Sequence, residues 1–548
     1  MDSACIPYTK VPKSSSLFLE YLYHFDHVAR FYNGSPFEIE SFRRVARDIK
    51  TVTYARRDLA DILLRQNRAL GCGEATLLNI LRLAEPETLA VVTGQQVGLF
   101  SGPAFTLYKA LTAVKLAQHL TEQGISCVPV FWLATEDHDL EEVARTGSLD
   151  DHYNWVELKD TGLRPAPQSS VGYVKLSDET ATALDRLEST LPAGESRDRL
   201  LGDLRDAYRP GATWGEAFGR FLARLLGRWG VIFLDPLQEE VHRLCAPIYR
   251  QAIEQAADLR ARLVERSHQL VRDGYHAQVH VGDDSTLLFM SQAGSRVALH
   301  QRPSKGGGFS VGGTRDVSAG ELTAAVANHS LDFTPNALFR PVVQDKLLPT
   351  VAYVAGPAEL AYHAQTAALY PAFGRPQPVI FPRAGFTLID ARAGRVMQKY
   401  GVRLEDAWQG EEHLNRRIVA AGFAEGRAKG WAERLDQSEQ DLGTLLERLR
   451  HDIEVIDPTL VDLLRHTDEK VRYQMERLRG KVTHAALQRS DVLRRHAEAL
   501  SNFLTPRKDL QERQVSGVYF LGRAGYTLLE RLLAEIQIGC SDQRVLSY

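Results

Sequence analysis

One stretch of the chain, residues 89–117, constrains the fold more than any other. It begins with an apolar run at residues 89–92, which is typical of a buried parallel strand. A polar turn containing glycines follows, and from Pro103 onward apolar residues recur at helical spacing. In open α/β sheets such strand–turn–helix units form the binding crevice, because ligands sit beyond the carboxyl ends of the strands. The sequence therefore predicts an α/β fold with a ligand crevice at this turn.

The turn itself carries residues suited to a polar ligand. Its spacing is neither G-x-G-x-x-G nor a Walker loop. Gln95 and Gln96 offer both donors and acceptors, which suits an uncharged polar part of a substrate. Gly98 and Gly102 allow a close approach of the backbone to a ligand. We predict that these four residues bind substrate; the alternative is that the glutamines cap the turn or face solvent.

A second apolar strand, expected at residues 127–134, ends in a cluster of ionisable residues. Glu136, Asp137, His138 and Asp139 follow it and should reach the same crevice. Carboxylates and an imidazole can act as a general base, as metal ligands or as partners for an ammonium group. A helix N-cap would explain one or two of the acids, but not a histidine between two aspartates. We predict that the last three are catalytic and that Glu136 binds substrate. No second ligand cluster supports a metal site.

The second half of the predicted core repeats this organisation. Apolar strands are expected at residues 231–234 and 347–355, and the latter leads into Gly356-Pro357 and a helix. A strand pair is expected at residues 378–390, where Arg383 is a candidate anion ligand, with a structural salt bridge as an equal alternative. Two such strand ends facing one crevice indicate a doubly wound sheet built from two halves.

Two insertions and two flanking segments complete the predicted core, which spans residues 89–395. Residues 145–212 are rich in polar residues, proline and glycine and are expected to cover the crevice, whereas residues 274–335 should form a small β-rich insert. Residues 1–88 are predicted to be an N-terminal helical layer. Residues 504–548 are predicted to pack back on the core.

From about residue 400 the pattern becomes that of a coiled coil. The first half of its apolar seam consists of Leu442, Leu446, Leu449, Ile453 and Ile456. This is the alternating four- and three-residue spacing of a coiled-coil seam. Asp457-Pro458 interrupts it, and the spacing resumes over residues 464–485. The pattern predicts an antiparallel helical hairpin within residues 400–503. The seam can close within the chain or pair two subunits, and we expect a homodimer.

Composition excludes several classes of function. Lys and Arg number 66 against 69 Asp and Glu, a formal net charge of -3, so no global positive field attracts nucleic acid. No apolar stretch is long enough to span a bilayer, and the first residues lack a secretory signal pattern. The 5 cysteines are scattered without a Cys-x-x-Cys pair, which argues against a disulfide scaffold. We expect a cytoplasmic protein that binds neither nucleic acid nor membrane.

Five motifs, in a fixed order along nearly the whole chain, carry a resemblance to a known family. They are Thr93–Gln96 with Gly102-Pro103, Phe131–Asp139, Arg340–Asp345, Gly356–Glu359 and Leu510–Arg513. In this combination the chain resembles the BshC family, cysteine ligases of bacillithiol synthesis. The resemblance implies a Rossmann-like core with two inserts and a C-terminal coiled coil that supports dimers. It also implies a reaction that joins the carboxyl group of cysteine to the amine of glucosaminyl-malate (GlcN-Mal) as an amide.

The resemblance also extends the set of expected site residues. It adds Gln344, Asp345, Gly356 and Glu359 as substrate-binding residues. A free carboxylate needs activation, normally by ATP, although the His-Ile-Gly-His and Lys-Met-Ser-Lys-Ser signatures of class I adenylating enzymes do not occur here. A metal requirement stays open. The alternative functions are a nucleotidyl or sugar-nucleotide transferase on the same core and a non-enzymatic dimeric scaffold.

Overall fold

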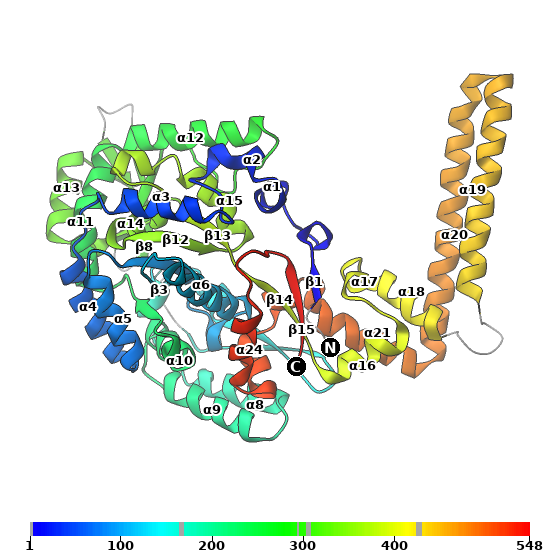
Figure 1. Cartoon of the computed structure of the whole chain (residues 1–548), viewed down its shortest axis with the longest axis horizontal. Coiled ribbons are helices and arrows are strands. Elements are labelled where there is room, and N and C mark those ends of the chain that lie inside the picture. Colours follow the sequence, from blue (N-terminus) through cyan, green and yellow to red (C-terminus); the bar gives the residue numbers. More distant parts are fainter. Residues whose placement is uncertain (1–3, 164–168, 293–294, 303–307, 423–429) are drawn as a thin grey trace.

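The computed structural model of the chain describes residues 4–163, 169–292, 295–302, 308–422 and 430–548 (Figure 1). A helical segment precedes the sheet, as the early apolar pattern predicts. Its principal helices are α1 (Ser16–Tyr23), α3 (Ile39–Ile49), α4 (Arg56–Ala69) and α5 (Glu74–Ala84). Among the described residues, no helix is long and apolar enough to cross a bilayer.

A five-stranded parallel sheet forms the centre of the molecule. Its strands are β2 (Leu89–Gln95), β3 (Cys127–Leu133), β6 (Ile232–Leu234), β12 (Thr350–Ala355) and β13 (Val379–Pro382). Their order in space is β13-β12-β2-β3-β6. The chain therefore moves outward from β2 in one direction and outward from β12 in the other. This is the predicted doubly wound arrangement, and its switch point lies between β2 and β12.

The apolar run of β2 is continuous because helices cover both faces of the sheet. Leu89 and Val91 pack with α3 and α6 (Phe105–Glu122), whereas Ala90 and Val92 pack into the core on the opposite face. Strands buried on both sides lose the alternation of polar and apolar residues. Strand β2 also continues through Gly94 to Gln95, so the predicted turn begins later than the apolar run suggests.

The two insertions differ in structure and in position. Residues 145–212 form a hairpin, β4 (Arg145–Leu149) and β5 (Trp155–Lys159), followed by α8 (Glu179–Thr190) and α9 (Glu195–Ala207). The second insertion is the predicted β-rich unit, an antiparallel sheet of order β10-β9-β8-β7-β11. Its elements are β7 (Ser285–Gln292), β8 (Ser295–Arg302), β9 (Gly308–Val311), β10 (Arg315–Val317), α13 (Ala319–Asn328) and β11 (Phe333–Pro335).

The strand pair expected at residues 378–390 is divided between two sheets, which corrects that prediction. Strand β13 joins the parallel sheet, whereas β14 (Gly385–Ile389) pairs with β15 (Gln543–Ser547), which in turn pairs with β1 (Ala4–Ile6). Strands β13 and β14 do not pair, because β15 pairs with β14 and the side chains of Gln511 and Glu512 accept from its backbone N–H groups at Leu388 and Phe386. The arrangement brings both ends of the chain together (Figure 1).

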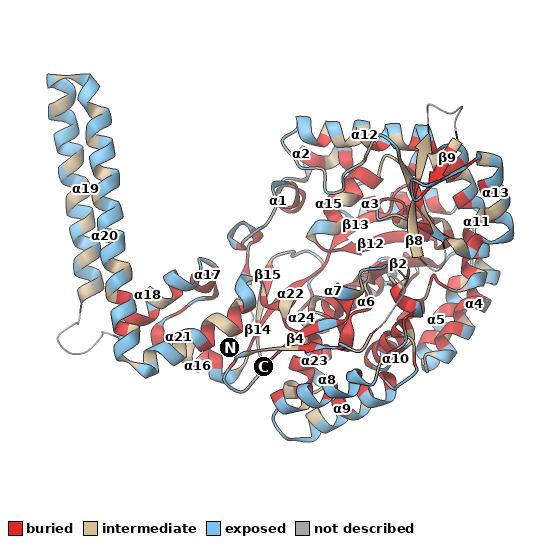
Figure 2. Cartoon of the chain, turned by 180° about the vertical axis from the view of Figure 1, so that it is seen from behind, coloured by how far each residue is buried: buried red, intermediate tan, exposed pale blue. Residues whose placement is uncertain are grey.

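The C-terminal part is helical and extends away from the core. It comprises α16 (Ala391–Tyr400), α17 (Leu404–Trp408), α18 (Glu411–Gly422), α19 (Trp431–Ile456), α20 (Val461–Arg489) and α21 (Asp491–Leu504). Helices α19 and α20 form the predicted antiparallel hairpin, which we call the arm, and it is largely exposed (Figure 2). The two helices contact each other, and Leu442, Leu446 and Ile453 of the predicted seam are half-buried, whereas Leu449 and Ile456 are exposed. Beyond α21, the chain returns to the core through α22 (Gln511–Gln514), α23 (Gly517–Ala524) and α24 (Thr527–Glu535).

Candidate active site

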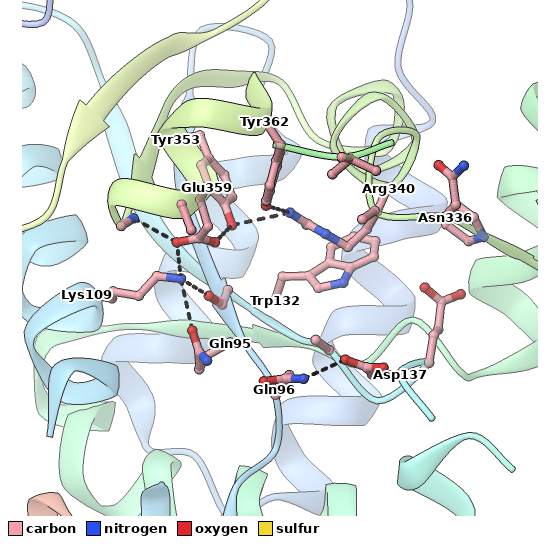
Figure 3. Close-up of a pocket in the computed structure, with 18 of the residues that line it drawn as sticks. Gln95, Gln96, Lys109, Trp132, Asp137, Asn336, Arg340, Tyr353, Glu359 and Tyr362 are labelled. Carbon is pink, nitrogen blue, oxygen red and sulfur yellow. Dashed lines mark hydrogen bonds and ion pairs between the residues drawn. The ribbon is translucent and has the colours of Figure 1, made fainter. Parts of the chain in front are cut away.

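A cavity of about 660 Å³ lies at the carboxyl ends of β2 and β12, at the switch point of the sheet (Figure 3). The turn after β2, the loop after β3 and the start of α15 (Pro357–Thr366) form its walls, and the β-rich insertion covers one side. The predicted site residues that line it are Gln95, Gln96, Glu136, Asp137, His138, Gly356, Glu359 and Arg383. The strand ends thus bring together residues from both halves of the core.

Three of the predicted site residues lie outside this cavity for local reasons. Gly98 and Gly102 shape a buried turn: a β-carbon at Gly98 would approach the Gly102 Cα to 2.9 Å, and Gly102 has a φ of +66°. Asp139 caps α7 (Leu140–Val143), where it accepts a 2.9 Å hydrogen bond from the backbone N–H of Glu142. The capping alternative therefore describes Asp139, but not Asp137 or His138.

Gln344 and Asp345 also lie outside the cavity, although both are completely buried. They belong to α14 (Arg340–Leu347). Asp345 accepts a 2.5 Å hydrogen bond from the Tyr370 hydroxyl, and its carboxylate lies 3.6 Å from Arg375. Gln344 accepts from Arg340 at 2.9 Å. These two residues pack behind the cavity wall.

The first insertion does not contribute to the cavity. Of its described residues, none lines the cavity, which corrects the expectation that residues 145–212 cover it.

Lys109 joins the two halves of the sheet, and sequence reasoning missed it. This α6 residue is 1% exposed, and its Nζ lies 2.6 Å from Oε2 of Glu359. It also donates to the carbonyl of Gly94 and, at 3.1 Å, to Oε1 of Gln95. Burial lowers the pKa of Lys109, and the nearby Glu359 carboxylate opposes that shift. The sequence does carry a sign of this role, because Lys109 is a lysine on a helical face whose other residues are apolar or small.

Glu359 organises the second half of the same junction. Its side chain accepts from the backbone N–H of Gly356 at 2.7 Å and from the Tyr353 hydroxyl at 2.8 Å. Burial would raise the pKa of Glu359, but Lys109 and these donors outweigh it and lower the pKa below its usual value. The pair fixes the end of β2 against the start of α15 (Figure 3).

Two arginines in the wall have only neutral acceptors among the described residues. Arg340 donates to Gln344, to the Tyr353 hydroxyl at 3.3 Å and to the Tyr362 hydroxyl at 3.1 Å. Arg296, from the β-rich insertion, stacks over Phe289 with its Cζ 3.9 Å from the ring centre. Both arginines are half-buried, and a cation that is partly withdrawn from water without a carboxylate partner favours an anionic ligand.

Two polar side chains of the cavity wall differ in how their donors are satisfied. The indole N–H of Trp132 is buried and has no acceptor among the described residues. Arg296 donates to Thr334 at 2.7 Å and to Nδ1 of His138 at 3.2 Å, and these two partners lie far apart in sequence. Buried donors usually have partners, but the indole N–H of Trp132 is unsatisfied and out of reach of the cavity, whereas Arg296 is held in place at the cavity wall.

The acidic side of the cavity consists of Glu136 and Asp137. Burial raises the pKa of Glu136 to about 7, although Arg296 and Arg340 act in the opposite direction. Asp137 accepts from Gln96 at 2.7 Å. The cavity thus holds carboxylates and guanidinium groups near one another without a direct ion pair between Glu136 or Asp137 and these arginines, which suits a ligand with both amine and anionic groups.

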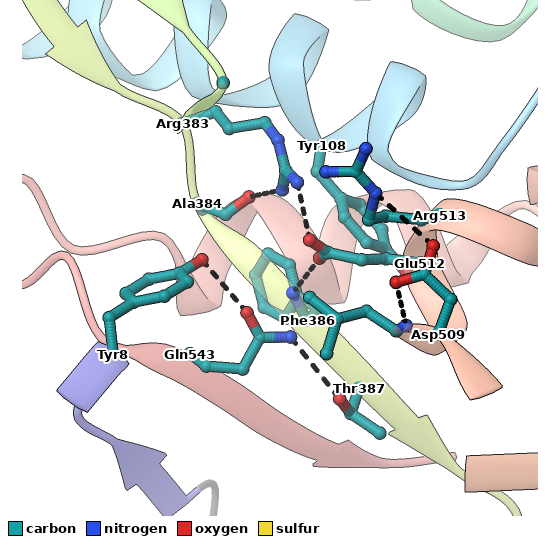
Figure 4. A network of polar contacts seen from close by, with 12 residues as sticks. Tyr8, Tyr108, Arg383, Ala384, Phe386, Thr387, Asp509, Glu512, Arg513 and Gln543 are labelled. Carbon is teal, nitrogen blue, oxygen red and sulfur yellow. Dashed lines mark hydrogen bonds and ion pairs between the residues drawn. The ribbon is translucent and has the colours of Figure 1, made fainter. Parts of the chain in front are cut away.

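Arg383 combines a cavity position with a structural ion pair. Its Nη2 lies 2.5 Å from Oε1 of Glu512, and both side chains are buried. Glu512 also accepts from the backbone N–H of Phe386 at 2.9 Å (Figure 4). The C-terminal segment therefore anchors the cavity floor, and Arg513 from the same segment lines the cavity. Among the residues that the structure describes, no group of three His, Cys, Asp or Glu is placed to hold a metal ion.

The fold is that of a Rossmann-like protein with a charged cavity at the switch point of its sheet and a coiled-coil arm. Sequence comparison agrees with this class. Residues 1–384 match the family described as "Bacillithiol biosynthesis BshC, N-terminal Rossmann-like domain". Residues 386–548 match "Bacillithiol biosynthesis BshC, C-terminal coiled-coil domain". The chain belongs to the BshC family.

Full-length relatives carry the same family name. A protein of Solibacter usitatus named "Putative cysteine ligase BshC" is 37% identical over 548 residues, 100% of both chains. Relatives with this name from Koribacter versatilis and Salinibacter ruber are 36% and 34% identical. The matches cover 99% of both chains in the first case, and 96% of this chain and 95% of the relative in the second.

Proposed function

We propose that this protein is a cysteine ligase that joins the carboxyl group of cysteine to the amine of glucosaminyl-malate as an amide. The name of its full-length relatives supports the class of reaction. The resemblance of its motifs supports the substrates. The observation that carries the proposal is the charge distribution in the cavity at the switch point.

This distribution matches the charges of the two proposed substrates. Cysteine has an ammonium and a carboxylate, and glucosaminyl-malate has an amine and two carboxylates. Arg296 and Arg340 lack carboxylate partners and suit the substrate carboxylates. Asp137 and Glu136 suit an amine, and Gln95 and Gln96 suit hydroxyl groups of the sugar or malate. His138, held by Arg296, borders the same space.

The reaction also requires an activated carboxyl group, and we propose ATP as its source. Joining a free carboxylate to an amine in water is unfavourable without a leaving group. The guanidinium groups of Arg296 and Arg340, which have no carboxylate partner, fit phosphate oxygens as well as carboxylates. A homodimer that forms through the arm remains part of the proposal.

Mass spectrometry of reaction mixtures tests the function. The full chain is incubated with cysteine, glucosaminyl-malate, ATP and magnesium, and each component is omitted in turn. We expect the amide only in the complete mixture. Arg340→Gln should reduce kcat/KM at least 100-fold, since it removes a half-buried positive charge from the cavity. The matched control Arg465→Ala, on the exposed arm, should retain full activity. Nucleotide turnover without cysteine would instead favour the transferase.

A further inference from the structure

A buried histidine lies directly behind one wall of the cavity. His242 belongs to α11 (Glu239–Glu254) and is 1% exposed. Its Nε2 lies 3.5 Å from Oε1 of Glu136, and its Nδ1 lies 3.1 Å from the carbonyl oxygen of Ser330. Glu136 itself lines the cavity. The two side chains therefore form a contact that leads from the cavity into the core.

The Ser330 carbonyl determines which nitrogen of His242 carries a proton. A carbonyl oxygen only accepts, so Nδ1 donates to it, and in the neutral ring Nε2 is then an acceptor. Among the described residues, Nε2 has no hydrogen-bond partner. It faces a carboxyl oxygen, and two acceptors in contact repel each other unless one of them is protonated. The contact becomes favourable when Glu136 is protonated and donates to Nε2.

We propose that Glu136 is the catalytic base of the condensation and that His242 is its positioning residue. This inference rests on the proposed function. The ammonium group of the amine substrate gives one proton to the Glu136 carboxylate, whose new O–H donates to Nε2 of His242. The freed electron pair on nitrogen attacks the activated carbonyl carbon of cysteine. The C–N bond forms, the bond from that carbon to its phosphate leaving group breaks, and the second proton leaves with the phosphate.

The surroundings of Glu136 suit a base that works near neutral pH. The charged and titratable groups that face it are Arg296, Arg340, Asp235, His242, Cys245, Tyr249 and Tyr173. Burial raises its pKa to about 7. Burial also lowers the pKa of His242 to about 4, although the backbone carbonyls of Ser330 and Phe333 act to raise it. The ring therefore stays neutral and can accept a hydrogen bond. A base is most effective when its pKa lies near the working pH.

Asp137 is less suited to this role because its oxygens are already engaged. One accepts from Gln96 at 2.7 Å, and the other accepts from the backbone N–H of His138 at 2.7 Å. These donors hold the carboxylate in place to bind an ammonium group. Glu136, by contrast, contacts Nε2 of His242, an acceptor that stabilises its protonated form.

The pH dependence of kcat/KM for amide formation tests the pair. Glu136→Gln should lose at least 100-fold in kcat/KM, the usual contribution of a general base. His242→Phe keeps the site buried but removes the acceptor that stabilises protonated Glu136. The rise of kcat/KM on the acidic side of the pH profile, the acid limb, should therefore move to lower pH. His242→Gln retains an acceptor oxygen, so it should move the acid limb less. The matched control is His363→Phe, another completely buried histidine, which should leave the limb in place.

A second measurement needs no turnover. Infrared titration of the ligand-free chain should show the C=O band of a protonated carboxyl group that disappears around pH 7 and is missing in Glu136→Gln. If the wild type forms no amide while this band titrates, the proposed function fails and the catalytic role fails with it. If the wild type forms amide but Glu136→Gln is fully active, or His242→Phe leaves the acid limb unmoved, this inference alone is overturned.

Discussion

The cavity and the arm use charged side chains in opposite ways. In the arm, pairs such as Arg465–Glu469 and Arg472–Asp468 lie one helical turn apart, with Arg465, Glu469 and Arg472 more than half exposed. In the cavity, Lys109 is 1% exposed and Glu359 is 20% exposed, and Arg340 donates only to neutral partners. Exposed pairs contribute little because water solvates each charge, whereas a buried charge depends on its particular partner. Charge that is shielded from water, more than charge density, therefore distinguishes the cavity from the arm.

Breaking the buried pair should have the largest effect. Lys109→Met leaves the largely buried Glu359 carboxylate without its cation, which should lower the free energy of unfolding by about 3 kcal/mol, the lower end of the cost for a fully buried pair. Urea unfolding measures this change. The double variant Lys109→Met with Glu359→Gln should recover part of the loss, because no unpaired charge remains. A single variant as stable as the wild type would contradict the contrast with the arm.

The second-largest effect should be a pH-dependent change in the free energy of unfolding caused by Glu136. The folded protein keeps this proton up to about pH 7, whereas the unfolded chain releases it near its ordinary value of 4.5. The contribution of Glu136 to the free energy of unfolding therefore falls as the pH rises across this window. Glu136→Gln should be more stable than the wild type at pH 8, by up to about 3 kcal/mol, and similar to it at pH 4. Equal differences at both pH values would refute the raised pKa.

The arm offers a smaller effect that concerns association. Leu463 and Leu478 are exposed by 64% and 52%, so both are free to contact another chain. If the expected homodimer forms there, changing both to Glu should weaken it at least tenfold, or about 1.4 kcal/mol, without altering the fold. Analytical ultracentrifugation over a concentration series measures the change. An unchanged dimer would place its interface elsewhere.

The exposed pair of the arm should give the smallest effect. Arg465→Ala removes the contacts with Glu469 and Asp462, both at the surface. The free energy of unfolding should change by less than about 0.5 kcal/mol, and less still in high salt. Urea unfolding at two salt concentrations checks this, as the counterpart of Lys109→Met. A loss of several kcal/mol would remove the distinction between the two regions.

The sequence by itself determined the features that depend on local pattern. The apolar run of β2, the glycines after it and the helical spacing of α6 predicted the parallel sheet and its crevice. The seam spacing around Leu446 and Leu464 predicted the antiparallel arm. The ionisable residues after β3 predicted Glu136, Asp137 and His138 as cavity residues. These signals lie within a few residues of one another, so no knowledge of distant contacts is needed.

Only the tertiary structure decided which charges are buried and which partners they have. Lys109 is an ordinary lysine in the sequence, and it becomes part of the site because Glu359, from the other half of the sheet, closes over it. Arg296 reaches His138 across 158 residues of chain. Conversely, Gln344 and Asp345 follow Arg340 closely in the sequence, but their side chains are buried in the core. Burial results from packing between distant segments, and the energy of a charge depends on that burial, so local pattern cannot determine it.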